Sequence, residues 1–283
     1  MTEHAAMQTS FSLKYKLYLV IKYTIYAWLT YNVFAFFAEE SAAMLSTHPD
    51  GLTLSNFIEV FPATLDTAAW VILLLAFEWE TFWASDDTLK GPIKYPLNVL
   101  KALCYGAIVF SWYGYIDSLL YYSDTVTMAV ANACDLVGQG YSTLVTVDEY
   151  VPLTAESCAA FSNTELYNLT DTKIISTAED YDAAMGLAWI DVINSSVWLI
   201  VVLALEADVY MQLRGTLTDL HMKISYYFKA ALYLTLLYCA VIWSLDSDFL
   251  DASDAFLWLI AFFMIELNVF EWHEEAEAEN AGQ

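Results

Sequence analysis

The chain has 283 residues, of which 59% are hydrophobic and 16% aromatic, and its mean hydropathy is +0.47. Such a composition, with several apolar runs longer than about 18 residues, excludes a water-soluble globule and predicts a polytopic membrane protein. The net charge of −25 excludes DNA or RNA as a partner. An acidic surface attracts cations instead.

Residues 1–11 have no apolar run and predict a disordered leader. The first apolar run, 12–37, is basic at its start, as a signal peptide is, but it is too long for one. It also contains a Lys-x-x-x-Tyr pattern that a cleaved leader would have no reason to share with the rest of the chain. The pattern occurs as Lys22 with Tyr26, Lys101 with Tyr105, and Lys229 with Tyr233. We therefore expect this first run to be a retained membrane helix.

One stretch, 66–80, returns twice, at 194–208 and 254–268. In each copy an Asp or Asn stands four residues before a Trp, a Glu follows that Trp by eight, and an acid or amide follows two residues later. The copies hold Asp66, Trp70, Glu78 and Glu80; Asn194, Trp198, Glu206 and Asp208; and Asp254, Trp258, Glu266 and Asn268. This spacing predicts an internal repeat.

The apolar runs, with Trp and Tyr near their ends, predict an all-α protein with six transmembrane helices. We expect them at 12–37, 57–83, 95–122, 186–213, 224–247 and 252–273. Each odd run carries Lys-x-x-x-Tyr and each even run carries the Trp and Glu, so we predict three pseudo-repeated helical hairpins. These cover residues 12–83, 95–213 with an insertion at 123–182, and 222–273, followed by an acidic tail at 274–283.

The basic residues predict the orientation. Six of the ten flank one side of the expected spans, three lie inside spans, and only Lys173 falls on the other side. By the positive-inside rule both termini are cytoplasmic, in a plasma membrane or a bacterial inner membrane. The insertion 123–182 then lies outside, where Cys134 and Cys158 are candidates for a disulfide. This bond would restrict the unfolded segment by about 3 kcal/mol.

Charges inside the expected spans are the main candidates for function. Lys22 and Glu78 lie at matching depth, and so do Lys101 with Glu206 and Lys229 with Glu266. A lone charge at such depth costs at least about 2.5–3.5 kcal/mol, so each Lys is expected to meet a Glu of its own hairpin or the next. The resulting belt either fixes the helices structurally or uses its carboxylates to bind a permeating ion. The column Glu80, Asp208 and Asn268 is expected to be a solvated edge.

Acidic groups also gather in the outer half of the even spans, where Asp66 and Asp254 would form a mouth for cations above the Glu level. Helix ends that face water carry acids for no special reason, so this pattern has a structural explanation as well. The columns Trp70, Trp198, Trp258 and Tyr26, Tyr105, Tyr233 either cap a cavity or pack the helices.

The sequence lacks the motifs of common membrane enzymes. None of the four His lies near the middle of a span, and no metal, haem, phosphate-loop or nucleophile motif occurs. We therefore expect no metal and no cofactor, and an enzyme only as a third alternative.

The composition and the charges together predict a channel or transporter for cations or protons. Its ion pathway would use Glu78, Glu206, Glu266, Asp66 and Asp254, with Lys22, Lys101 and Lys229 as countercharges. The alternative is a non-catalytic structural or assembly subunit of a larger membrane complex. Expected partners are the lipid bilayer, cations or protons, and a second copy of the chain or another membrane protein.

Overall fold

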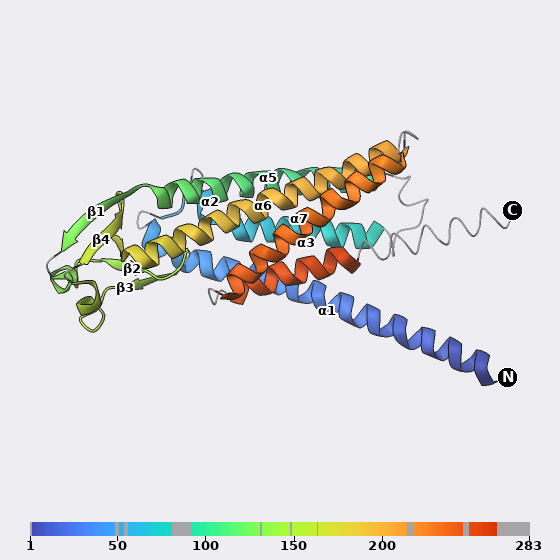
Figure 1. Cartoon of the computed structure of the whole chain (residues 1–283), viewed down its shortest axis with the longest axis horizontal. Helices are drawn as coiled ribbons and strands as arrows, with labels where there is room; N and C mark the ends of the chain where they lie inside the picture. Colours follow the sequence, from blue (N-terminus) through green and yellow to red (C-terminus); the bar gives the residue numbers. More distant parts are fainter. Residues whose placement is uncertain are drawn as a thin grey trace.

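The computed structural model describes residues 2–48, 51–53, 56–80, 92–130, 132–147, 149–162, 164–213, 218–245 and 249–264. The chain forms an elongated bundle of helices that carries a small sheet at one end (Figure 1). The helices are α1 Thr2–Thr47, α2 Phe57–Val60, α3 Pro62–Glu78, α5 Lys94–Ser123, α6 Ala178–Leu213, α7 Asp219–Leu245, and a last helix over residues 249–264. Helix α1 begins at Thr2, where the sequence predicts a disordered leader.

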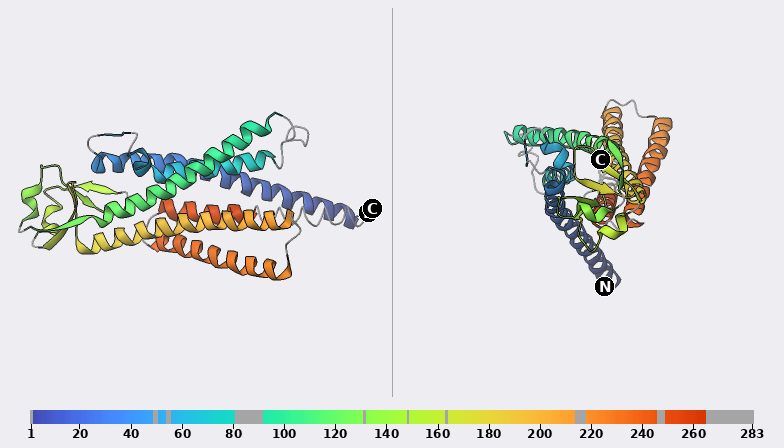
Figure 2. Two further views of the ribbon diagram at one scale, coloured as in Figure 1. Left: turned by 90° about the horizontal axis from the view of Figure 1, so that it is seen from above. Right: turned by 90° about the vertical axis from the view of Figure 1, so that its left-hand side faces the viewer.

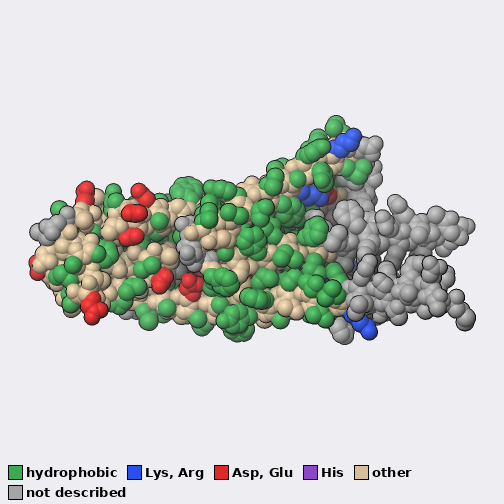
Figure 3. Space-filling view, turned by 60° about the horizontal axis from the view of Figure 1, so that its bottom comes forward, with side chains coloured by type: hydrophobic (Ala, Val, Ile, Leu, Met, Phe, Trp, Pro, Cys, Tyr) green, Lys and Arg blue, Asp and Glu red, His purple; other side chains and the backbone are tan. Residues whose placement is uncertain are grey.

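Three helices are long and apolar enough to cross a membrane among the residues that the structure describes. They are α5, the segment Ala178–Leu205 of α6, and the segment Leu220–Leu245 of α7. The face in Figure 3 carries hydrophobic side chains over the middle of the bundle, with acidic groups toward the sheet end and basic groups toward the opposite end. The prediction of a mostly helical protein with apolar spanning helices is confirmed at this level.

The prediction of an all-α protein is wrong for the insertion. Residues 125–176 fold into a five-stranded sheet of order β1-β4-β5-β2-β3, with antiparallel pairs except between β2 and β5. The strands are β1 Thr125–Val130, β2 Ser142–Leu144, β3 Tyr150–Pro152, β4 Thr164–Leu169 and β5 Ile174–Ser176, and two short 3-10 helices, Ala133–Leu136 and Cys158–Phe161, lie between them. The sheet lies at the C-terminal end of α5 and the N-terminal end of α6 (Figure 2).

The two faces of this sheet pack against different groups. Ile174 contributes to the core shared with the ends of α5, α6 and α7 that lie next to the sheet, while Ile175 contributes to a separate small core. Adjacent strand residues point to opposite faces, which explains this division. Cys134 and Cys158 lie in the small core and form a disulfide.

Helix α3 begins where the expected second span is interrupted. Pro62 stands at its first position, where the missing N–H costs no hydrogen bond. Phe61, the preceding residue, has no capping side chain, and the buried Glu40 of α1 takes its place. The carboxylate of Glu40 accepts hydrogen bonds from the backbone N–H of Ala63 at 2.7 Å and of Thr64 at 3.1 Å. This acid therefore caps α3 from a neighbouring helix.

The short helix α2 lies against α5 at a glycine. A Cβ added to Gly114 would stand 2.8 Å from the carbonyl oxygen of Ile58, so only glycine permits this approach. Two larger cores hold the bundle together. One joins the sheet to the neighbouring helix ends, and the other surrounds Leu29, Val201 and Leu236 in the middle of the bundle. The candidate site lies between these two cores.

Candidate functional site

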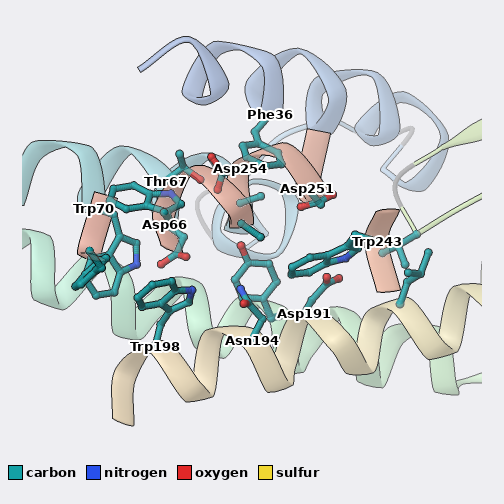
Figure 4. Close-up of a pocket in the computed structure, with 17 residues that line it drawn as sticks. Phe36, Asp66, Thr67, Trp70, Asp191, Asn194, Trp198, Trp243, Asp251 and Asp254 are labelled. Carbon is teal, nitrogen blue, oxygen red and sulfur yellow. The ribbon is translucent and has the colours of Figure 1, made fainter. Parts of the chain in front are cut away.

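A cavity of about 60 Å³ lies inside the bundle (Figure 4). Every helix from α1 to the last one except α2 contributes to its wall, and Val147, from the loop between β2 and β3, contributes as well. Figure 4 shows Asp66, Asp191, Asp251, Asp254 and Asn194 turned toward this shared space. We call this cavity the acidic chamber.

The acidic chamber is where the three similar stretches of sequence meet. The first polar position of each stretch lines it, as Asp66, Asn194 and Asp254, and so does the Trp four residues later, as Trp70, Trp198 and Trp258. The three indoles are in contact, because the ring centroid of Trp70 lies 6.1 Å from that of Trp198 and 6.2 Å from that of Trp258. Residues far apart in sequence thus form one wall of the chamber.

The helices that carry the Lys-x-x-x-Tyr pattern, α1, α5 and α7, contribute a further set of lining residues that sequence reasoning missed. Phe36, Tyr115 and Trp243 each stand fourteen residues after the Lys of their helix, and all three line the chamber. Ten residues after the same Lys, each helix places a small or polar residue with 0% exposure: Asn32, Ser111 and Cys239. A search for weaker columns aligned on the three Lys residues would have found both sets.

Two carboxyls of the chamber were also missed. Asp191 and Asp251 each stand three residues before the first polar position of their stretch, and Ala63 occupies the matching place in α3. Residues three apart share a helix face, so this signal was present in the sequence. Among the described residues that line it, the chamber therefore has four carboxyls and no Lys, Arg or His.

The groups next to the chamber carboxyls are neutral hydrogen-bond donors. The Asn32 Nδ2 donates to Asp254 Oδ1 at 2.7 Å. The indole N–H of Trp70 donates to Asp66, and that of Trp258 donates to Asp254, as the four-residue spacing allows. Two buried acceptors, Oδ1 of Asn32 and Oδ1 of Asn194, have no hydrogen-bond partner within the described part of the chain. Such acceptors need a donor that the protein itself does not supply.

A second cavity, of about 330 Å³, lies on the other side of the aromatic contacts. Trp70, Trp258 and Phe262 line both cavities and separate them. The second cavity is mainly apolar, and Lys101 and Tyr105 are its polar lining groups. These aromatic side chains thus belong to the walls of both cavities.

Lys22 and Glu78 form a buried ion pair beyond this layer. The Lys22 Nζ lies 2.6 Å from Glu78 Oε2, and the side chains are 2% and 7% exposed. The hydroxyls of Tyr23 and Tyr26 donate to the same carboxylate at 3.0 and 3.4 Å. The rings of Tyr18, Tyr23 and Tyr26 surround the ammonium group within about 6.0 Å. This carboxylate is therefore neutralised and fixed by its neighbours.

The two other expected countercharges pair with described acids, while the partners predicted for them, the side chains of Glu206 and Glu266, lie outside the described residues. Lys101 of α5 pairs with Glu80 of α3, and Lys229 of α7 pairs with Asp208 of α6 at 3.0 Å. Glu80 and Asp208 belong to the column expected as a solvated edge; both are partly exposed, and each also binds a Lys. Glu78 and Glu80 reach different helices since they point to opposite sides of α3. All four side chains are 22–29% exposed.

Some predicted residues cannot be placed as site groups. The side chain of Glu206 and the whole of Glu266 lie outside the described residues. Tyr233 packs against the core in the middle of the bundle. Within the described ranges, no group of three or more His, Cys, Asp or Glu lies close enough together to hold a metal ion.

The fold and the chamber fit a helical membrane protein with a polar cavity in its core. No protein-family model, no curated protein sequence and no solved structure matches the chain. The argument for function therefore rests on the chamber itself.

Proposed function

We propose that this protein is a membrane channel or transporter for cations or protons, and that the acidic chamber is its binding site. The observation that carries this proposal is the set of four inward-facing carboxyls, with no basic residue in the part of the lining that the structure describes. A carboxylate removed from water needs a compensating positive charge. Here the compensation must come from solution, as a cation or a proton.

The architecture that we propose has six spans arranged as three hairpin repeats around the chamber. α1, α3 and the last helix would complete the set with α5, α6 and α7. Support comes from the sequence positions that meet in the cavity. One residue each from α1, α5 and α7 lines it at matching positions, and so do at least two residues each from α3, α6 and the last helix. An approximate threefold axis through a cavity places equivalent side chains around one central site, as a transport pathway requires.

We propose that the sheet end faces outward and that both chain termini are cytoplasmic. The distribution of charge supports this orientation, because acidic groups gather toward the sheet end and basic groups toward the other end (Figure 3). A disulfide between Cys134 and Cys158 agrees with an oxidising compartment on the sheet side.

The structure corresponds to a closed state under this proposal. The aromatic layer of Trp70, Trp258 and Phe262 separates the chamber from the second cavity. At the outer side, Val147 lines the chamber, and its carbonyl accepts hydrogen bonds from the hydroxyls of Tyr122 and, at 2.9 Å, of Tyr150. Apolar constrictions of this kind stop ion flow until they move or fill with water.

The experiment that tests the proposal is ion flux into liposomes that contain the purified protein. Wild-type protein should move protons or at least one of Na⁺, K⁺ and Ca²⁺, and Asp66→Asn, which keeps the shape but removes the charge, should lower the rate at least tenfold. Asp182→Asn is the matched control, because Asp182 is an exposed carboxyl on α6 outside the chamber. A folded wild-type protein that moves none of these ions would overturn the proposal.

A second function, that of a structural subunit in a membrane complex, is favoured by one observation. The Lys22–Glu78 pair is held by two tyrosine hydroxyls and three tyrosine rings, which is an arrangement for fixing helices rather than for releasing an ion. Under this alternative the protein itself moves no ion, so replacing the chamber carboxyls by Asn has no flux to remove. Purification from native membranes with a partner in fixed ratio would support it.

A further inference from the structure

We infer that the species taken up by the acidic chamber is the proton and not a metal cation. This inference rests on the proposed function and narrows it, because the carboxyls alone would suit either kind of charge. Three properties of the chamber separate the two: the spacing of its ligands, its size, and the hydrogen-bonding groups in its wall.

The spacing of the carboxyls disfavours a bare metal ion. Ca²⁺ takes about six to eight oxygen ligands, and Mg²⁺ demands a near-ideal octahedral set. Within the described residues no three acidic, His or Cys side chains converge closely enough to ligate one ion. The four chamber carboxyls come from α3, α6 and the last helix and face each other across a space instead of around a point (Figure 4).

The size of the chamber disfavours a hydrated ion. Its volume of about 60 Å³ gives room for only a few water molecules. An ion that keeps its water shell would have to displace side chains of the wall. It would then have to pass the rings of Trp70, Trp258 and Phe262, whose centroids lie 6.0–6.3 Å apart.

The chamber wall offers the groups that hold and pass protons. Asn32 is completely buried and bonds to Asp254, yet its Oδ1 has no partner within the described ranges, and neither has the buried Oδ1 of Asn194. A water molecule or a protonated carboxyl would supply the missing donor to such an acceptor. These unpaired acceptors are independent of the acidic residues and indicate that donors enter this space.

The proton balance of the step is simple. A carboxylate oxygen of Asp66 or Asp254 takes a proton from a hydronium ion that reaches the chamber from the outer side, which leaves water there. The resulting O–H gives the proton to a water molecule on the inner side, which becomes hydronium, when the aromatic layer opens. The other titratable groups among the described residues that line the chamber are Tyr115 from α5, Asp191 from α6 and Asp251 from the last helix, and Glu40 of α1 lies near Tyr115. All of them are acids, so binding one proton relieves repulsion among the rest.

The test compares the ions directly in sealed liposomes with the whole chain. Proton flux is followed with an internal pH dye under an imposed K⁺ potential, and uptake of Na⁺, K⁺ and Ca²⁺ is measured in parallel. We expect proton flux that falls at least tenfold in both Asp66→Asn and Asp254→Asn but stays within twofold in Asp182→Asn, and no uptake of the three metal ions above that of empty liposomes. An infrared band of a protonated carboxylic acid should be present in the wild type and weaker in the Asp66→Asn, Asp254→Asn double variant.

The outcomes separate this inference from the proposed function. Uptake of a metal cation that depends on Asp66 overturns the proton inference and leaves the transport proposal standing. An infrared spectrum that the double variant does not change also overturns it. A folded wild-type protein without flux of any ion overturns both.

Discussion

The acidic chamber and the Lys22–Glu78 pair hold the same chemical group inside one bundle, yet in opposite surroundings. Glu78 meets an ammonium group at 2.6 Å and two tyrosine hydroxyls. Asp66 and Asp254 meet indole and amide donors, one another and further acids. A buried carboxyl that the protein neutralises stabilises the fold, whereas one that it leaves to be neutralised from solution is suited to binding.

The largest effect on stability should come from removing the positive partner of the buried pair. Lys22→Met leaves Glu78 charged and buried without compensation, which costs about 3–5 kcal/mol. Thermal unfolding in detergent should show a clear loss of stability. The double variant Lys22→Met, Glu78→Gln should recover most of it, and a double variant no better than the single one would contradict a pairwise role.

The disulfide in the outer sheet should have the next largest effect. Cys134 and Cys158 are 24 residues apart, and a bridge over such a loop restricts the unfolded segment by about 3 kcal/mol. Cys158→Ser should make the segment between β1 and β4 sensitive to protease while the helical circular dichroism remains. Equal protease resistance with and without reductant would show that the sheet does not depend on the bridge.

A third kind of buried acid, Glu40, should give an intermediate effect. Its carboxylate caps α3 through the N–H groups of Ala63 and Thr64, and losing such a cap costs about 0.5–2 kcal/mol. Glu40→Ala should therefore lower the unfolding temperature less than Lys22→Met does. Glu40→Gln keeps one acceptor oxygen and is the control, which should fall between Glu40→Ala and the wild type.

The smallest effect should come from the partly exposed pair of Lys229 with Asp208. At 24% and 25% exposure, solvent screens this pair, and removing it should change the free energy of unfolding by less than about 1 kcal/mol. Lys229→Met measured beside Lys22→Met in the same detergent checks this. A loss of stability as large as that of Lys22→Met would mean that solvent exposure does not set how much each of these two ion pairs contributes.

The helices could be predicted from the sequence because their apolar runs are long and continuous. The α5 helix, Lys94–Ser123, differs from the expected span 95–122 by one residue at each end. The sheet was missed because its strands are only three to six residues long and pair with distant partners, such as Thr125 with Leu169. Short strands with non-local pairing leave little local signal.

The candidate site could be predicted only in part. Asp66 and Asp254 were expected in the outer half of their helices, and both line the chamber. Asp191 and Asn32 were not singled out, because their columns are weaker than those that define the repeats: Ala63 stands at the position that matches Asp191, and Cys239 at one that matches Asn32. The pairs of Lys101 with Glu80 and of Lys229 with Asp208 were not foreseen, because matching depth says nothing about which face of a helix a carboxyl occupies.

The most direct test of the contrast is to measure flux and thermal stability together in Asp66→Asn and Glu78→Gln. Both variants replace one carboxyl by an amide of the same shape. We predict that Asp66→Asn unfolds at or above the wild-type temperature and loses flux, while Glu78→Gln is destabilised and its folded fraction keeps flux. If Asp66→Asn keeps its flux, the chamber is not the binding site. If in addition Glu78→Gln is stable and silent, the paired carboxylate is.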